Sequence, residues 1–153
     1  MFALAAGGAA GAWCICRNRK YPVRSELSFA NKLAVPGWAL NAGTDSPLWN
    51  AGLNRKMWEI YLRDGNCGML EYAAPMLARD FSGLPPAYVE VEESDCLHDE
   101  GIAYAQSLRA AGVDVQLEDV KGTFHGFDVF ADKEVSKTMV QKRMQALCRA
   151  FSC

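Results

Sequence analysis

Two residues in the C-terminal half of the chain have side chains that could act together as a general acid and base. His125 stands in the segment "KGTFHGFDVF", between an aromatic residue and a glycine, and Asp95 stands earlier, in "EESDCLHDEG". A carboxylate bound to one imidazole nitrogen fixes the tautomer and stabilises the imidazolium, which leaves the other nitrogen free to take a proton from a nucleophile. The two residues therefore suit nucleophilic catalysis, provided that the fold brings them together.

Each residue alone also has an ordinary structural explanation. A histidine in a loop is more often a surface or hydrogen-bonding residue, and an aspartate at the end of a strand often caps the next helix. What favours a functional reading is their placement, because Asp95 and His125 follow two consecutive stretches that read as strands.

Regular patterns surround both residues. Residues 87–92 alternate apolar and polar side chains after a proline pair, and residues 113–120 alternate again. Between them, residues 99–112 have apolar residues at helical spacing, and residues 133–151 form an amphipathic helical pattern. The order strand, helix, strand, helix predicts an α/β fold with a parallel sheet and flanking helices. Ligands of such sheets bind beyond the carboxyl ends of the strands, where Asp95 and His125 would meet.

The first half of the chain is less regular. Residues 9–16 fit a buried helix of small residues, residues 21–23 fit the tail of a strand, and residues 25–47 show no period. The segment "DSPLWNAGLNRKMWEIYLRDG" predicts a helix that ends at Gly65. Its tryptophans are expected to pack the helix onto the core. The alternative is that a tryptophan stacks on a ligand, and three are candidates: Trp38, Trp49 and Trp58.

Composition excludes several classes of function. A chain of 153 residues, half of them hydrophobic, is expected to form one domain. The net charge is −2 and the basic residues are scattered, so we expect no nucleic-acid partner. Six cysteines without a CxxC pair and only two histidines predict reduced thiols in a cytoplasmic protein, with no metal site and no cofactor. Glycines interrupt the apolar N-terminus, which is shorter than the roughly 20 residues of a membrane span. We therefore expect no membrane span.

The stretch "LPPAYVEVEESDCLHDEGIAYAQSLRAAGVDVQLEDVKGTFHGF" closely resembles the C-terminal part of the hormone-sensitive-lipase-like branch of the α/β-hydrolases. That family has a proline pair, a strand, Asp-Pro-Leu-x-Asp-Glu-Gly, a helix, a strand and His-Gly-Phe, in this order. Cys96 stands where the family has its usual proline. The resemblance implies a carboxylic-ester hydrolase of partial α/β-hydrolase fold, with Asp95 as the acid and His125 as the base of a Ser-His-Asp triad. It implies one domain over residues 1–153, with a helical cap or loop region at 25–80 and a core at 84–153.

The nucleophile of that family is missing from the sequence. Its nucleophile elbow reads Gly-Asp-Ser-Ala-Gly-Gly, and alignment of the paired glycines with Gly7 and Gly8 puts Ala5 in the place of the serine. The His-Gly-Gly-Gly segment of the oxyanion hole and the N-terminal strands of the fold are missing too. We therefore expect little or no turnover from this chain alone.

Two explanations remain open for such a chain. It is either a fragment of a longer hydrolase, which would act on a small ester once completed by an N-terminal half, or a shortened, non-catalytic binding or interaction protein. In both cases the remaining sheet would have an uncovered edge, and such an edge tends to pair with another chain. The sequence therefore predicts a homo-oligomer.

Overall fold

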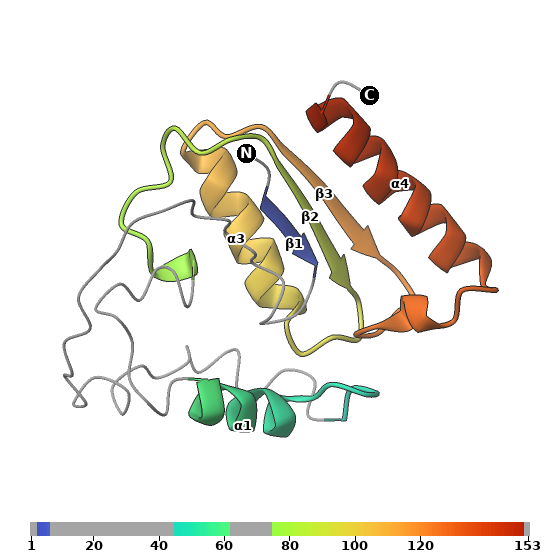
Figure 1. Cartoon of the computed structure of the whole chain (residues 1–153). Coiled ribbons are helices and arrows are strands. Elements are labelled where there is room, and N and C mark those ends of the chain that lie inside the picture. Colours follow the sequence, from blue (N-terminus) through green and yellow to red (C-terminus); the bar gives the residue numbers. More distant parts are fainter. Residues whose placement is uncertain (1–2, 7–44, 62–74, 152–153) are drawn as a thin grey trace.

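The computed structural model describes residues 3–6, 45–61 and 75–151, and for residues 3–6 it describes the backbone alone. The described strands are β1 (Ala3–Ala6), β2 (Ala87–Glu92) and β3 (Val115–Val120), which form a parallel sheet in the order β1-β2-β3. Figure 1 shows the three arrows pointing the same way. The predicted α/β architecture with a parallel sheet is thereby confirmed.

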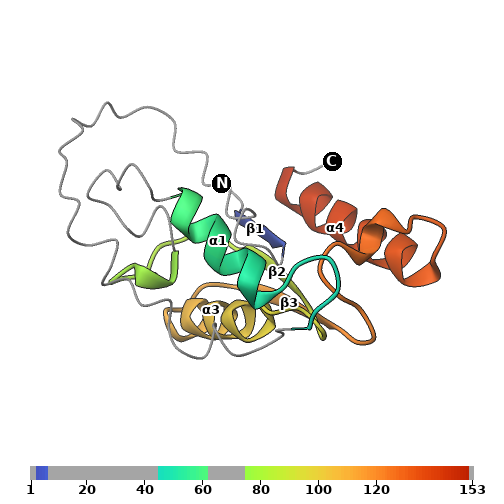
Figure 2. The same cartoon turned by 90° about the horizontal axis from the view of Figure 1, so that it is seen from below.

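Two of the described helices cover the sheet. They are α3 (His98–Ala110) and α4 (Glu134–Phe151), which confirm the helices predicted at 99–112 and 133–151. Figure 2 shows them on opposite sides of the strands. Short 3₁₀ turns at η1 (Pro75–Leu77) and η2 (Phe127–Val129) complete the described C-terminal part.

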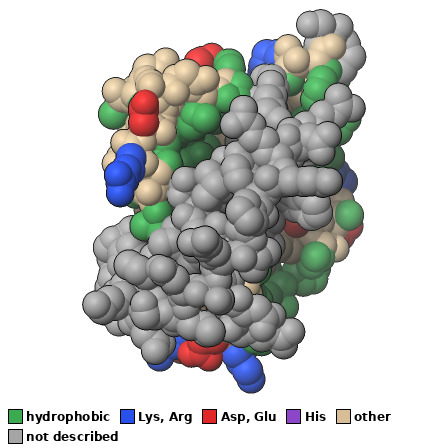
Figure 3. All heavy atoms as spheres, turned by 60° about the vertical axis from the view of Figure 1, so that its left-hand side comes forward, with side chains coloured by type: hydrophobic (Ala, Val, Ile, Leu, Met, Phe, Trp, Pro, Cys, Tyr) green, Lys and Arg blue, Asp and Glu red, His purple; other side chains and the backbone are tan. Residues whose placement is uncertain are grey.

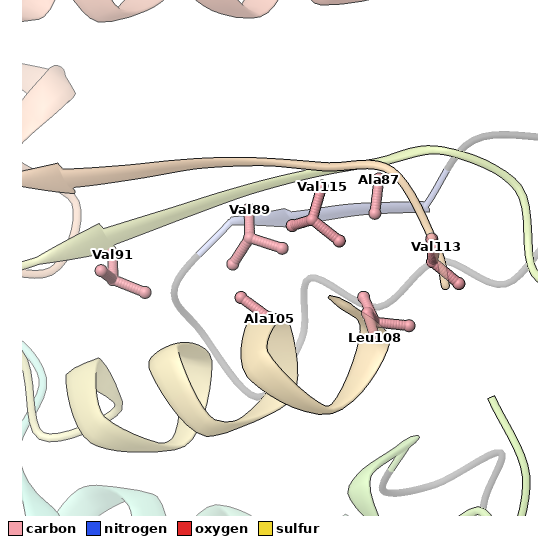
Figure 4. Close-up of a cluster of buried hydrophobic side chains, with 7 residues drawn as sticks. All are labelled: Ala87, Val89, Val91, Ala105, Leu108, Val113 and Val115. Carbon is pink, nitrogen blue, oxygen red and sulfur yellow. The ribbon is translucent and has the colours of Figure 1, made fainter. Parts of the chain in front are cut away.

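The core between the sheet and α3 fixes the end of β2. One face of β2 and β3 packs on α3 through the seven side chains labelled in Figure 4: Ala87, Val89, Val91, Ala105, Leu108, Val113 and Val115. The helix approaches the sheet closely at Gly101, because a Cβ atom placed there would lie 2.3 Å from Cγ1 of Val91. This contact holds the start of α3, and with it the loop between β2 and α3, against the strand.

The other face of β2 is polar and also buried. All six residues of the strand are buried, including Glu90 at 1% exposure and Glu92 at 4%. Alternating polar residues are typical of a strand with one face in water. Here α4 covers that face and provides a cation for Glu90, as the ion pair with Arg143 shows.

Helix α1 (Ala51–Tyr61) confirms the helix predicted within residues 45–65. It lies beyond the carboxyl ends of the strands (Figure 1) and buries only Ala51 and Asn54. Trp49, just before the helix, packs with Ala51, Cys96 and Leu97, as expected of a packing tryptophan.

Several predictions fall on other parts of the chain. The predicted helix at 9–16, the strand tail at 21–23, Trp38 and Gly65 lie outside the described residues. The division into a region at 25–80 and a core at 84–153 stays a prediction.

None of the helices in the described ranges is long and apolar enough to cross a membrane. Among the described side chains on the face shown in Figure 3, the charged ones are scattered and form no single patch.

Candidate active site

The structure brings Asp95 and His125 together at the carboxyl ends of β2 and β3. Nδ1 of His125 lies 2.8 Å from Oδ2 of Asp95, although the residues are 30 positions apart. The Asp95 side chain is fully buried, whereas 27% of the His125 side chain is exposed. The carboxylate is therefore shielded from water, and the imidazole reaches the surface of the described structure.

The second oxygen of Asp95 is also used. Oδ1 accepts a hydrogen bond of 3.0 Å from the backbone N–H of Leu97, which makes a local Asx turn at the start of α3. Leu97 is itself the N-cap residue, and no side chain caps the helix. The Asp95 side chain therefore does not cap the helix. Its Oδ1 stabilises the loop, and its Oδ2 binds the imidazole.

Hydrogen bonds donated by backbone N–H groups join the loops that carry the two residues. Ser94 N–H donates to the carbonyl of Thr123 at 2.9 Å, and Gly122 N–H donates to Oε2 of Glu93 at 2.9 Å. Gly122 has a φ of 70°, a conformation that favours glycine and turns the chain sharply after β3. The loops are held together next to the pair, so its geometry does not depend on the pair's own hydrogen bond alone.

An aromatic ring lies against the imidazole. The rings of Trp49 and His125 are stacked, with centroids 5.7 Å apart and an angle of 29° between their planes. The sequence singled out Trp49 only as one of three tryptophans, and no spacing rule links it to His125. Trp58, in contrast, makes an edge contact with Tyr61.

Two titratable side chains beside Asp95 are held in their neutral forms. Burial, and next the charge of Asp95, raises the pKa of Glu92 to about 8. The same two causes raise the pKa of the Cys96 thiol to about 12, so this thiol is a poor nucleophile and serves to pack the loop. One oxygen of Glu92, Oε2, is buried with no hydrogen-bond partner among the described residues.

A buried ionic network anchors the chain just after His125. Arg143 on α4 binds Glu90 of β2 through Nε, at 3.1 Å from Oε2, and through Nη2, at 2.5 Å from Oε1. Its Nη1 lies 2.6 Å from Oδ2 of Asp128 in η2. Tyr88 donates to the same Glu90 at 2.8 Å. The hydrogen bonds to Glu90 hold the pKa of Arg143 above its usual value, so the network keeps its cation. Sequence reasoning missed it, because no local pattern connects α4 with β2.

Two further residues of interest lie elsewhere. His98, which received no role from the sequence, contacts Asp99 at 2.9 Å and Asp119 at 3.4 Å. Ala5 lies within β1, in register with Val89 of β2, and its side chain is outside the described structure. Its assignment to the nucleophile position stays a prediction. Within the described ranges, no group of three or more histidine, cysteine or acidic side chains could hold a metal ion.

Comparison with known proteins gives consistent matches to esterases. Residues 21–129 match a family described as alpha/beta hydrolase fold. Carboxylic ester hydrolase LipN of Mycobacterium tuberculosis is 44% identical over 68 residues, which are 44% of this chain and 18% of that protein. Neutral cholesterol ester hydrolase 1 of Rattus norvegicus is 40% identical over 60 residues, covering 38% of this chain and 15% of that protein.

A solved structure of a bacterial heroin esterase superposes with a TM-score of 0.66 and 37% identity. The superposition covers 72% of this chain and 37% of that one. The matched part of the chain thus spans well under half the length of these relatives.

Proposed function

The chain belongs to the alpha/beta hydrolase fold family, and on that premise we propose that it provides the acid and the base of a serine-type triad for the hydrolysis of carboxylic esters. Asp95 is the acid and His125 is the base. The observation that carries the proposal is the 2.8 Å contact between Oδ2 of Asp95 and Nδ1 of His125. The ester hydrolases among the relatives support an ester as the substrate.

Each nitrogen of the imidazole has its own role in this proposal. Oδ2 of Asp95 accepts a hydrogen bond from Nδ1–H, so Nε2 carries the lone pair that removes the proton of an attacking serine hydroxyl. The imidazolium then returns this proton to the departing alkoxide of the ester, which leaves an acyl-enzyme. Water, deprotonated by the same Nε2, releases the carboxylic acid. The buried carboxylate of Asp95 stabilises the imidazolium at each stage.

In this proposal the serine and the oxyanion-hole donors are supplied by sequence that is not present in this chain. Ala5 occupies the nucleophile position in this proposal, and a methyl group cannot attack a carbonyl carbon. The chain alone is therefore inactive. Restoring a hydroxyl through Ala5→Ser gives little turnover, because the N–H donors that stabilise the oxyanion are still missing.

A hybrid protein tests the proposal. The N-terminal part of the bacterial heroin esterase, where the resemblance to the family places the nucleophile elbow, is joined to residues 45–153 of this chain, and the hybrid is assayed with p-nitrophenyl butyrate. We expect turnover from the hybrid and none from this chain alone. His125→Ala should lower kcat by at least about 10³-fold in the hybrid, and Asp95→Asn should also lower it strongly. His98→Ala is the matched control, because the polar partners of this second histidine among the described residues are the exposed carboxylates of Asp99 and Asp119, and it should leave kcat unchanged.

Two results would overturn the proposal. One is a folded, active hybrid in which His125→Ala retains full activity. The other is robust turnover from the present chain, with Ala5 intact or with Ala5→Ser as the only change. A hybrid that binds esters without hydrolysing them would favour a non-catalytic binding role.

The natural partner of the open sheet edge is a second copy of the chain. Among the described strands, β1 pairs only with β2, so its other edge is free for hydrogen bonding in that part of the structure. Pairing of two β1 edges would satisfy the backbone N–H and C=O groups along these edges. Light scattering over a range of concentrations checks for this dimer, and a monodisperse monomer would refute it.

Location in the cytoplasm also stays a prediction, which rests on the cysteine pattern alone.

A further inference from the structure

We infer that Trp49 is a positioning residue for the proposed base: a turn at residues 47–49 holds its indole against one face of His125 and fixes the plane of the imidazole. The inference rests on the proposed role of His125. It adds a residue from the segment before α1 to a site that is otherwise built at the ends of β2 and β3.

The turn before Trp49 is conformationally costly. The backbone N–H of Trp49 donates to the carbonyl of Pro47 at 2.7 Å, and Leu48 between them has a φ of 61°. A three-residue turn with positive φ at its centre is the rare, strained form of the γ-turn, and leucine seldom adopts this φ. Leu48 is 62% exposed, so its own packing does not explain the conformation. Strain of this kind persists where neighbouring contacts hold it.

Those neighbouring contacts are made by Trp49 and the residue after it. Trp49 packs with Ala51, Cys96 and Leu97, which places the indole on the loop that carries Asp95. Asn50 Oδ1 accepts a 3.1 Å hydrogen bond from the N–H of Leu53, which caps the start of α1. The turn is thus fixed on its C-terminal side, and the indole touches both the loop of the acid and the ring of the base.

The stacking supplies a constraint that Asp95 cannot. A single hydrogen bond to Nδ1 fixes one atom of the imidazole and leaves the ring free to rotate about that bond. The indole at 5.7 Å and 29° restricts this rotation, so the direction of the Nε2 lone pair is set. Nε1 of Trp49 has no hydrogen-bond partner among the described residues, so packing and stacking, not a polar contact, orient the indole.

Nuclear magnetic resonance of the full chain tests the inference without any need for catalysis. In the wild type we expect nuclear Overhauser contacts between indole and imidazole protons, together with a slowly exchanging Nδ1–H of His125. Trp49→Phe keeps an aromatic ring and should preserve the slow exchange. Trp49→Leu keeps apolar volume but no ring, and should speed exchange of Nδ1–H with water about tenfold. Trp58→Leu is the matched control, since Trp58 contacts Tyr61, and it should change nothing.

Variants at Leu48, in the centre of the turn, test the inference independently. Leu48→Gly accepts positive φ freely and should retain the indole–imidazole contacts, whereas β-branched Leu48→Val disfavours that φ and should lose them. Absence of these contacts in the wild type would overturn the inference, as would a folded Trp49→Leu variant with unchanged Nδ1–H exchange. If Trp49→Leu does not fold, the inference is decided by the indole–imidazole contacts of the wild type and by the comparison of Leu48→Gly with Leu48→Val. Failure of the hybrid esterase assay leaves these signals in place, so the two proposals fail separately.

Discussion

Glu90 on β2 and Arg143 on α4 form a two-pronged ion pair across 53 positions of sequence, with the Glu90 carboxylate almost completely buried. The remaining amino group of Arg143 binds Asp128, close behind His125. One cation thus ties the central strand, the last helix and the turn after the proposed base to one another. Because Arg143 is the cation that binds this buried carboxylate among the described residues, we expect its loss to destabilise the fold strongly.

Removal of Arg143 should therefore cost more than removal of the whole pair. Arg143→Leu leaves Glu90 buried without its cation and should lower the free energy of unfolding by about 3–5 kcal/mol, measured by urea titration. The double variant Arg143→Leu with Glu90→Leu should recover part of this loss, because the uncompensated charge is gone. Lys142→Leu is a neighbouring control that breaks a more exposed pair with Glu118, and it should cost less than about 1 kcal/mol. Equal losses in the single and double Arg143 variants would contradict this account.

Glu92 should make stability fall as pH rises towards 8. Burial, and next the charge of Asp95, raises its pKa to about 8 from an ordinary value of 4.5, so the folded state holds a proton that the unfolded state has lost between these values. Stability therefore decreases with rising pH across this window, by up to about 1.4 kcal/mol per pH unit. Glu92→Gln stays neutral throughout and should show a smaller decrease when urea unfolding is compared at pH 5, 6, 7 and 8. Parallel pH curves for wild type and variant would rule out this role of Glu92.

Gly101 should not accept even one extra methyl group. Alanine normally stabilises a helix relative to glycine, but the new Cβ would lie 2.3 Å from Cγ1 of Val91. We expect Gly101→Ala to lower the melting temperature, with a net cost of about 1–3 kcal/mol from overpacking. The double variant with Val91→Ala makes room for the methyl group and should lose less than the sum of the single losses. Strict additivity would mean that the contact is relieved by some other movement.

Asp95→Asn should reverse the tautomer of His125. The carboxylate can only accept a hydrogen bond, which keeps the proton on Nδ1, whereas an amide can donate to Nδ1 and move the proton to Nε2. Nitrogen chemical shifts of ¹⁵N-labelled histidine at neutral pH distinguish these forms. Asp99→Asn, which alters a partner of His98, is the control and should leave the His125 signals unchanged. An unchanged His125 tautomer in Asp95→Asn would show that another group sets it.

The sequence predicted those features that depend on local pattern. Alternation and helix-end signals located β2, α3, β3 and α4, because period and capping are properties of neighbouring residues. The approach of Asp95 to His125 followed from one topological rule, since consecutive parallel strands end at the same edge of the sheet.

Other contacts have no such local signal. The stacking of Trp49 on His125 joins the segment before α1 to a loop far along the chain. The burial of Glu90 could not be predicted from the sequence either, because alternation shows which side chains share a face of the strand and not what covers that face. In the region of residues 7–44, the expected small-residue helix and strand tail stay predictions.

The hydrogen bond between acid and base closes within one continuous stretch, from the start of β2 at Ala87 to the turn at Phe127. The proposed acid and the proposed base are therefore encoded in one uninterrupted segment of the chain. A change in the sequence before Ala87 can therefore leave this hydrogen bond in place, although it would remove the constraint that we infer Trp49 places on the plane of the imidazole.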